Sequence, residues 1–202
     1  GSVYQLTAIL RGVDTWPDDY ELVAAAFGDS PYATYTKVIH APAREGEPVS
    51  VILSGMREVN QVESCAVNRL RKRIVTFYQT EFTLQEDTLF VDAGTLDVSI
   101  SNGVQQQVFN TDCIGCHGAS TFAAANLFLT EGKSEAALVG VPSTRSEAGK
   151  LLVTPRSPDE SFLMDVLTHP EAVRHDHVDI LSAKPDKLTL LEAWIESIKT
   201  NL

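Results

Sequence analysis

The chain has 202 residues, of which 44% are hydrophobic, and this length accommodates one large domain or two small ones. Its formal net charge of −11 makes nucleic acid a poor partner, because phosphate contacts need clustered Lys and Arg side chains. The longest apolar run, Leu22 to Phe27, is much shorter than the roughly 18 residues of a membrane-spanning helix, so no such helix is expected.

The first half of the chain has the composition of short β-strands. Strand-forming residues dominate residues 3–10, 32–39, 49–53, 73–78, 89–91 and 96–100. Gly, Pro and Asp separate these segments, as in Gly28-Asp29-Ser30-Pro31. About seven short strands in roughly 100 residues predict an antiparallel, immunoglobulin-like β-sandwich over residues 3–101. The Cys-Trp-Cys core of antibody domains is absent, which leaves the topology open.

Residues 102–202 change to a helical period. Apolar side chains recur at three and four residues near the end of the chain: Leu188, Leu191, Trp194, Ile195 and Ile198. Pro185 is expected to open this last helix. An earlier helix is expected after Ser157, which has the chemistry of an N-cap, with Pro158 in the first turn and Glu160 completing a capping box.

The stretch Cys113-Ile114-Gly115-Cys116-His117 is the attachment signature of a c-type haem. On one helical turn the two thiols reach the two vinyl groups of a porphyrin and form thioethers, and the following imidazole points at the iron. We therefore predict one covalent haem c, held by Cys113 and Cys116, with His117 as an iron ligand. A zinc site is the alternative, but zinc takes four ligands and the nearby sequence supplies three.

A helix that carries Phe109 and the haem cysteines, followed by a C-terminal helix with a tryptophan, resembles the bacterial monohaem cytochrome c domain. Further matching segments are Leu138–Ser143, Val153–Pro155 and Ser157–Leu163. They point to a subgroup that is often fused to other envelope domains. The resemblance implies an all-α cytochrome c domain over residues 102–202, with Phe109 and Trp194 forming a wall beside the haem.

The sixth iron ligand departs from the pattern of this family, in which many members use a methionine before the tryptophan of the last helix. The corresponding position here is Asp176 or His177, so we predict bis-histidine ligation with His177 opposite His117. His175 is the second choice, because residues two apart in an extended loop point to the same side. Met164 is a rival, although it falls within a helical apolar pattern.

Two strong axial ligands leave no open position on the iron, and a second imidazole lowers the reduction potential. The expected function is therefore electron transfer to an unidentified redox protein, without enzymatic activity. A peroxidase would require an open position. The alternative function is an envelope binding or adhesion module whose haem is structural or senses a ligand. Arg156 is the candidate partner of a haem propionate, with Arg145 and Lys150 as weaker choices.

Thioether attachment to haem takes place outside the cytoplasm in bacteria, so the resemblance implies the periplasm or the outer-membrane-associated cell envelope. Gly1-Ser2 has the form of an expression scar, and an export signal or lipid anchor is expected upstream. The acidic chain favours a protein partner with a basic face. Cys65, outside the motif, is expected to be a buried thiol.

Overall fold

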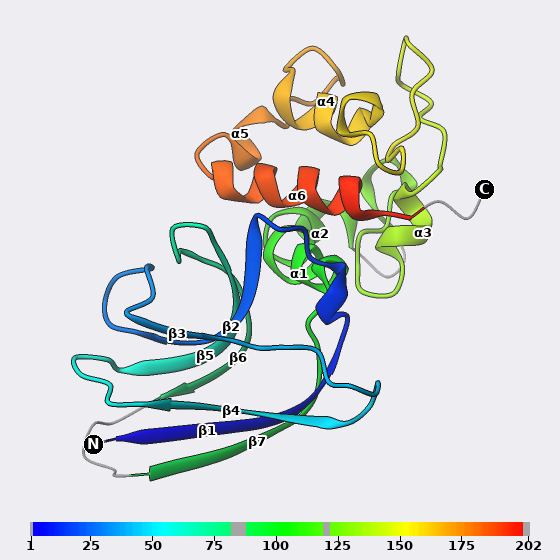
Figure 1. Ribbon diagram of the computed structural model, residues 1–202. Helices are drawn as coiled ribbons and strands as arrows, with labels where there is room; N and C mark the ends of the chain where they lie inside the picture. Colours follow the sequence, from blue (N-terminus) through cyan, green and yellow to red (C-terminus); the bar gives the residue numbers. More distant parts are fainter. Residues whose placement is uncertain (1, 82–87, 119–121, 200–202) are drawn as a thin grey trace. The chain divides into compact units, whose positions relative to one another are not determined.

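Two β-sheets from the first half of the chain dominate the computed structural model, which describes residues 2–81, 88–118 and 122–199 (Figure 1). The chain divides into two compact units, Gly1–Gly103 and Val104–Leu202. The structure is thus mostly β, with a smaller helical part. No helix among the described residues is long and apolar enough to cross a membrane.

The first sheet has three strands in the order β4-β1-β7, with β1 at Val3–Arg11, β4 at Pro48–Ser54 and β7 at Thr88–Asp97. Strand β1 runs antiparallel to β4 and parallel to β7, so the sheet is mixed and the expectation of a purely antiparallel sandwich is wrong. Every second side chain of β1 is buried, which is the period of a strand with one face on a core.

The second sheet has four antiparallel strands in the order β3-β2-β5-β6. These strands are β2 at Tyr20–Phe27, β3 at Tyr35–Val38, β5 at Gln61–Asn68 and β6 at Arg73–Glu81. The two central strands, β2 and β5, are buried along most of their length on both faces. Together the two sheets have a β-sandwich-like architecture.

A carboxylate is buried in the centre of the second sheet. Glu63 on β5 has no exposed surface and accepts hydrogen bonds from Nε of Arg73 (2.9 Å) and the hydroxyl of Thr76 (2.6 Å). The Arg73 guanidinium also lies over the ring of Phe27, at 4.0 Å from its centroid. Cys65, two residues after Glu63 on the same strand, is fully buried, which confirms the expected buried thiol.

The second unit consists of short helical segments joined by long irregular connections. Its segments, with the helix that leads into it, are α1 (Ile100–Val104), η2 (Gln105–Cys113), α2 (Ile114–His117), η3 (Ala124–Asn126), α3 (Ser134–Leu138), η4 (Pro158–Glu160), α4 (Phe162–Thr168), α5 (Val178–Leu181) and α6 (Pro185–Ser197). A further short helix, η1 (Val13–Thr15), lies in the first unit.

The expectation of an all-α domain over residues 102–202 is wrong. Between α3 and α4 the chain forms isolated β-bridges, which pair Val139 with Val153 and Leu151 with Ser161. The physical reason is local: Gly140 has a positive φ of 72°, and Pro142 removes a backbone donor, so this segment cannot continue a helix. Its backbone pairs across the loop instead, with the Leu152 N–H donating to the Val141 carbonyl at 2.7 Å.

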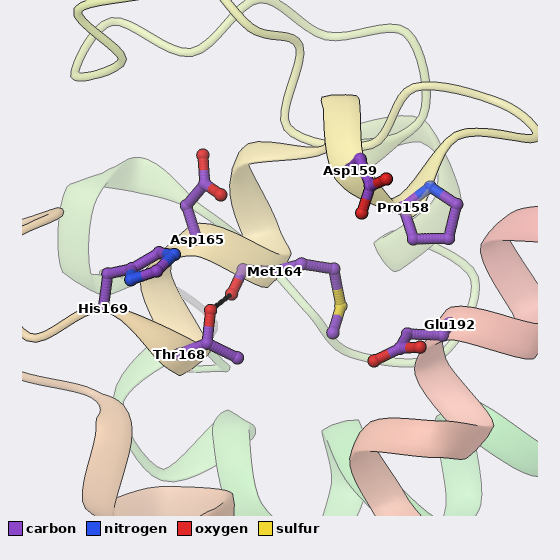
Figure 2. A pocket seen from close by; sticks show the side chains of 7 residues that line it. All are labelled: Pro158, Asp159, Met164, Asp165, Thr168, His169 and Glu192. Atoms are coloured by element: carbon purple, nitrogen blue, oxygen red, sulfur yellow. Dashed lines mark hydrogen bonds between the residues drawn. The ribbon is translucent and has the colours of Figure 1, made fainter.

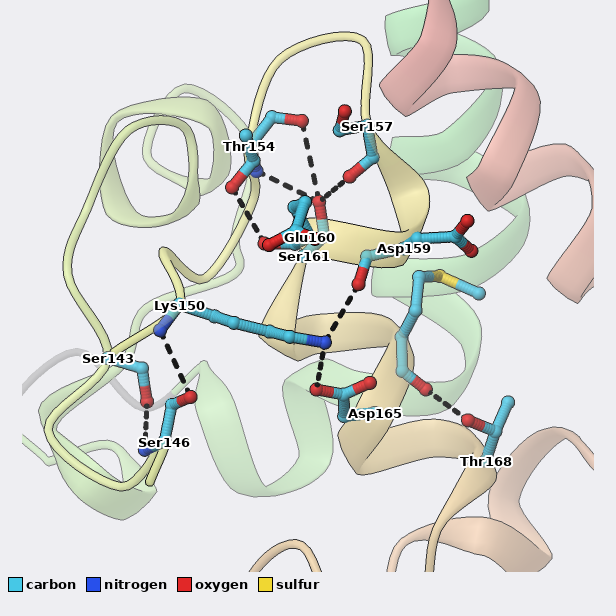
Figure 3. Close-up of polar contacts among 11 residues, drawn as sticks. Ser143, Ser146, Lys150, Thr154, Ser157, Asp159, Glu160, Ser161, Asp165 and Thr168 are labelled. Carbon is cyan, nitrogen blue, oxygen red and sulfur yellow. Dashed lines mark hydrogen bonds and ion pairs between the residues drawn. The ribbon is translucent and has the colours of Figure 1, made fainter. Parts of the chain in front are cut away.

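The helix expected after Ser157 begins later than predicted. Residues Pro158–Glu160 form only a 3-10 turn, and Ser161 is the N-cap of α4. The hydroxyl of Ser161 donates to the Ser157 carbonyl at 2.8 Å and accepts from the Thr154 N–H at 2.9 Å (Figure 3). This buried serine therefore ties the bridged segment to the start of α4.

Candidate functional site

The motif residues lie at the end of a helical segment with an unusual pitch. Segment η2 is π-helical, with the Ile114 N–H donating to the carbonyl of Phe109, five residues earlier. The wider turn ends at Cys113, and α2 then carries Cys116 and His117. Stretches of π-helix are costly in isolation and occur preferentially at functional sites.

The two motif cysteines have different surroundings. Both are free thiols, with Cys113 half-buried and Cys116 exposed. Burial and, to a smaller extent, the charge of Asp112 raise the pKa of the Cys113 thiol to about 11, against a lowering by the charge of Lys187. Cys113 is therefore protonated at neutral pH.

Helix α6 is joined to the motif by a carboxylate with two lysine partners. Asp112 accepts hydrogen bonds from Nζ of Lys184 at 2.7 Å and from Nζ of Lys187 at 2.6 Å. Burial raises the pKa of Asp112, but the hydrogen bonds and charges of the two lysines outweigh that effect and hold it below its usual value. Nearby, the rings of Phe109 and Trp194 meet edge to face, with centroids 5.9 Å apart. The structure thus brings together the two residues expected to form an aromatic wall.

The ring of His117 is oriented by a turn of the backbone. Its Nδ1 lies 2.9 Å from the carbonyl oxygen of Ala124 and 3.2 Å from that of Leu127. Between these residues, Ala125 and Asn126 both have a left-handed φ, near 56°. This conformation costs an alanine about 1 kcal/mol or more. The turn that places two carbonyl oxygens next to Nδ1 of His117 is therefore strained.

His177 faces His117 from the loop that precedes α5. The two ring centroids are 6.3 Å apart and the ring planes are inclined by 30°. Nδ1 of His177 lies 2.5 Å from the carbonyl oxygen of His175. In each ring, therefore, Nδ1 is within hydrogen-bond distance of a backbone carbonyl oxygen, and Nε2 has no hydrogen bond with another described residue.

His175 and Met164, the other two candidate ligands, occupy different positions. His175 is exposed, with its ring edge on His177 at a centroid distance of 5.2 Å. Met164 is buried and lines a pocket of about 360 Å³ together with His169 and Glu192 (Figure 2). No residue of the Cys113–His117 motif lines that pocket.

The cationic side chains expected near the propionates are exposed or already paired. Arg156 is exposed, has a φ of 72°, and donates its backbone N–H to the Ile195 carbonyl at 2.9 Å. Arg145 is exposed as well. Lys150 is 3.0 Å from the carboxylate of Asp165 and donates to the Asp159 carbonyl (Figure 3).

Comparisons with protein-family models, with curated proteins and with solved structures find no match. Within the described ranges, no group of three or more His, Cys, Asp or Glu side chains is close enough to hold a metal ion. The expected membership of the cytochrome c family is therefore wrong, and the fold of residues 102–202 agrees with this correction. The same finding leaves the zinc alternative without support.

Two features of the site were missed from the sequence. The backbone carbonyls that orient His117 have no side-chain signature, and Asn126, a residue that tolerates a left-handed conformation, is the only hint. The pairing of Asp112 with Lys184 and Lys187 joins segments about 70 residues apart, which no local pattern could reveal.

Proposed function

We propose that this chain binds one haem through thioethers to Cys113 and Cys116, with His117 and His177 as axial ligands, and that it transfers electrons in the bacterial cell envelope. The proposal depends on the motif and on the two imidazoles. It does not depend on membership of the cytochrome c family.

The distance between the rings of His117 and His177 carries the proposal. Two imidazoles that bind one metal ion from opposite sides through Nε2 have centroids about 6 Å apart, because each metal–nitrogen bond is about 2 Å and each nitrogen lies about 1 Å from its ring centre. The separation of 6.3 Å between the ring centroids of His117 and His177 fits this arrangement. Among the described residues, no third His, Cys, Asp or Glu side chain joins these two imidazoles in a metal-binding group, so a planar group such as a porphyrin suits the remaining positions on the metal.

The hydrogen bonds at Nδ1 support the same assignment. A histidine ligand commonly donates its second ring N–H to a carbonyl or carboxylate, which fixes the tautomer and makes the other nitrogen a better donor to metal. His117 has two such carbonyl partners and His177 has one. Both Nε2 atoms are thereby left as lone-pair donors.

A haem with two histidine ligands supplies reversible one-electron oxidation and reduction, without an open position for oxygen or peroxide. The chain's own residues set the conditions for it. Phe109 and Trp194 give an apolar packing next to the motif helix, and the pair of lysines on Asp112 holds α6 against that helix. The net charge of −11 favours a redox partner with a basic face.

The test is expression of the full chain together with haem-attachment machinery, followed by absorption spectra of the oxidised and reduced protein. We expect a covalently attached haem that is low-spin in both states and lacks the long-wavelength charge-transfer band of methionine–iron ligation. His177→Ala should convert the haem to a high-spin or ligand-accessible form. His169→Ala, which removes an exposed histidine of the same unit, is the matched control and should leave the spectrum unchanged.

Two results would contradict the proposal. One is a polypeptide whose mass shows no added haem although a control cytochrome is matured in the same cells. The other is a low-spin spectrum that His177→Ala leaves unchanged, which would transfer the ligand role to His175 or Met164.

A further inference from the structure

In the part of the first unit that the structure describes, the two sheets end in four edge strands, and three of them carry features that hinder pairing with another chain. Strand β3 has only four residues and includes the exposed Lys37. Strand β6 shifts register twice against β5. Strand β7 has a register shift against β1, and the exposed Asp92 and the left-handed Gly94 lie within it.

Strand β4 has none of these features, and its one proline, Pro48, is confined to the first position of the strand. Its pairing with β1 runs from Ile9 opposite Pro48 to Val3 opposite Ser54 without a shift. No residue from Pro48 to Ser54 is charged, and Val49, Val51 and Ile52 are β-branched. A regular, neutral edge strand of this length is a template for a further strand.

The hydrogen-bond pattern shows which groups of β4 point outward. The Gly55 N–H donates to the Ser2 carbonyl at 3.1 Å, so these residues form a hydrogen-bonded pair at the end of the ladder. Because such pairs alternate along an antiparallel ladder, Ser50, Ile52 and Ser54 direct their N–H and C=O groups away from β1. Among the described residues, no hydrogen bond to these outward backbone groups is found. The side chains of the same three residues are exposed.

We propose that the free edge of β4 pairs antiparallel with β4 of a second copy of this chain, which joins the two three-stranded sheets across a two-fold axis. The pairing needs residues with outward groups opposite each other, so Ile52 lies opposite its own counterpart and Ser50 lies opposite Ser54. This inference is independent of the haem proposal, since it uses only residues of the first unit.

The charges at the two ends of β4 favour a second copy as the occupant. Glu47 directly precedes the strand, 3.8 Å from the exposed Arg44, and Arg57 is the third residue after the strand; both Glu47 and Arg57 are exposed. With Ile52 at the centre, an antiparallel partner brings Glu47 of each copy next to Arg57 of the other. Two copies of a chain with net charge −11 repel one another, and the strand itself adds no charge to this repulsion.

The association should stop at two copies. An antiparallel strand pair across a two-fold axis is isologous and uses the β4 edge of both chains. The opposite edge of each sheet is β7, whose register shift and Asp92 hinder further growth. The expected product is therefore a closed dimer with one continuous six-stranded sheet.

The test is sedimentation velocity on the full chain over a hundredfold range of protein concentration. We expect a monomer–dimer equilibrium in the wild type. Ile52→Pro removes the outward N–H at the centre of the pair and should weaken dimerisation more than tenfold. Ile52→Thr keeps that N–H and the β-branched shape, and it should stay within about threefold of the wild type.

A charge pair provides a second measurement that does not depend on tolerance of proline. Ser50→Lys with Ser54→Glu places opposite charges across the interface, whereas Ser50→Lys with Ser54→Lys places like charges there. Dimerisation should differ by about fivefold or more between the two variants, with the Lys–Glu variant tighter. A monomer at every concentration, equal affinities of the two charge variants, or species larger than a dimer would each overturn the proposal.

Discussion

Gly118, directly after His117, lies where a side chain has no room. A Cβ atom at this position would lie 2.6 Å from the carbonyl oxygen and 2.8 Å from Cβ of Ile114, the first residue of α2. Because one of these atoms belongs to the backbone, the clash cannot be relieved by a rotamer change. Gly118→Ala must displace either the end of α2 or the start of the loop that orients His117.

Gly115, inside the same helix, is the matched control. A Cβ there meets nothing within 4 Å, and alanine is favoured over glycine within a helix by about 1 kcal/mol. Overpacking of the kind expected at Gly118 costs about 2 kcal/mol. We therefore expect Gly118→Ala to lower the free energy of unfolding of the second unit by about 2 kcal/mol, and Gly115→Ala to leave it unchanged or slightly raised.

The assay is urea unfolding followed by NMR of the tryptophan indole N–H groups. The chain has two tryptophans, and only Trp194 lies in the second unit, where it is buried against Phe109. Its indole signal therefore reports the unfolding of that unit separately from the β-sheets. Equal midpoints for the two variants, or a lower midpoint for Gly115→Ala, would refute the steric reasoning.

Three further predictions concern charged groups and thiols. Because the pKa of Asp112 is lowered in the folded state, this carboxylate stabilises the protein above its unfolded pKa of about 4, and the stabilisation is lost as the pH falls through the folded pKa. Asp112→Asn should therefore make the stability depend less on pH on the acid side of a stability–pH curve measured by thermal unfolding. Glu63→Gln breaks the buried ion pair with Arg73 and should lower the free energy of unfolding of the first unit by about 3 kcal/mol, measured by urea unfolding. The control is Glu21→Gln on the neighbouring strand β2, where the side chain is exposed, and it should have almost no effect. In the haem-free chain, iodoacetamide should modify the exposed Cys116 before Cys113, whose raised pKa leaves little thiolate; mass spectrometry of digests at timed intervals measures the order, and faster labelling of Cys113 would contradict it.

The content of strand-forming residues predicted β1, and helical periodicity predicted α6. Strand β1 alternates buried and half-exposed residues, and α6 begins at Pro185 as expected. Strand β5 was missed because its polar centre, Glu63 to Cys65, hides a buried strand. The Glu63 carboxylate can be buried in β5 because Arg73, from the next strand, donates a hydrogen bond to it.

The motif identified the candidate site, but its surroundings depend on contacts that the sequence does not encode locally. The offset from Trp194 drew attention to His177, and the structure brings that ring next to His117. The expectation of an all-α domain over residues 102–202 was wrong because it extended a resemblance of short segments to the loops that connect them. Those connections contain the positive φ of Gly140 and isolated bridges in place of helix.

The parallel pairing of β1 with β7 has a mechanical consequence. Val3 pairs with Thr88 and Arg11 with Asp97, so the first and last strands of the unit lie side by side and point the same way. A force that pulls the two ends of this unit apart acts along both strands in opposite senses and loads all their hydrogen bonds together in shear. The antiparallel pair β1–β4 is not loaded in this way, because β4 lies in the interior of the chain. The first unit is thus built to resist a force that pulls its two ends apart, with the β1–β7 pair as the element that must rupture first.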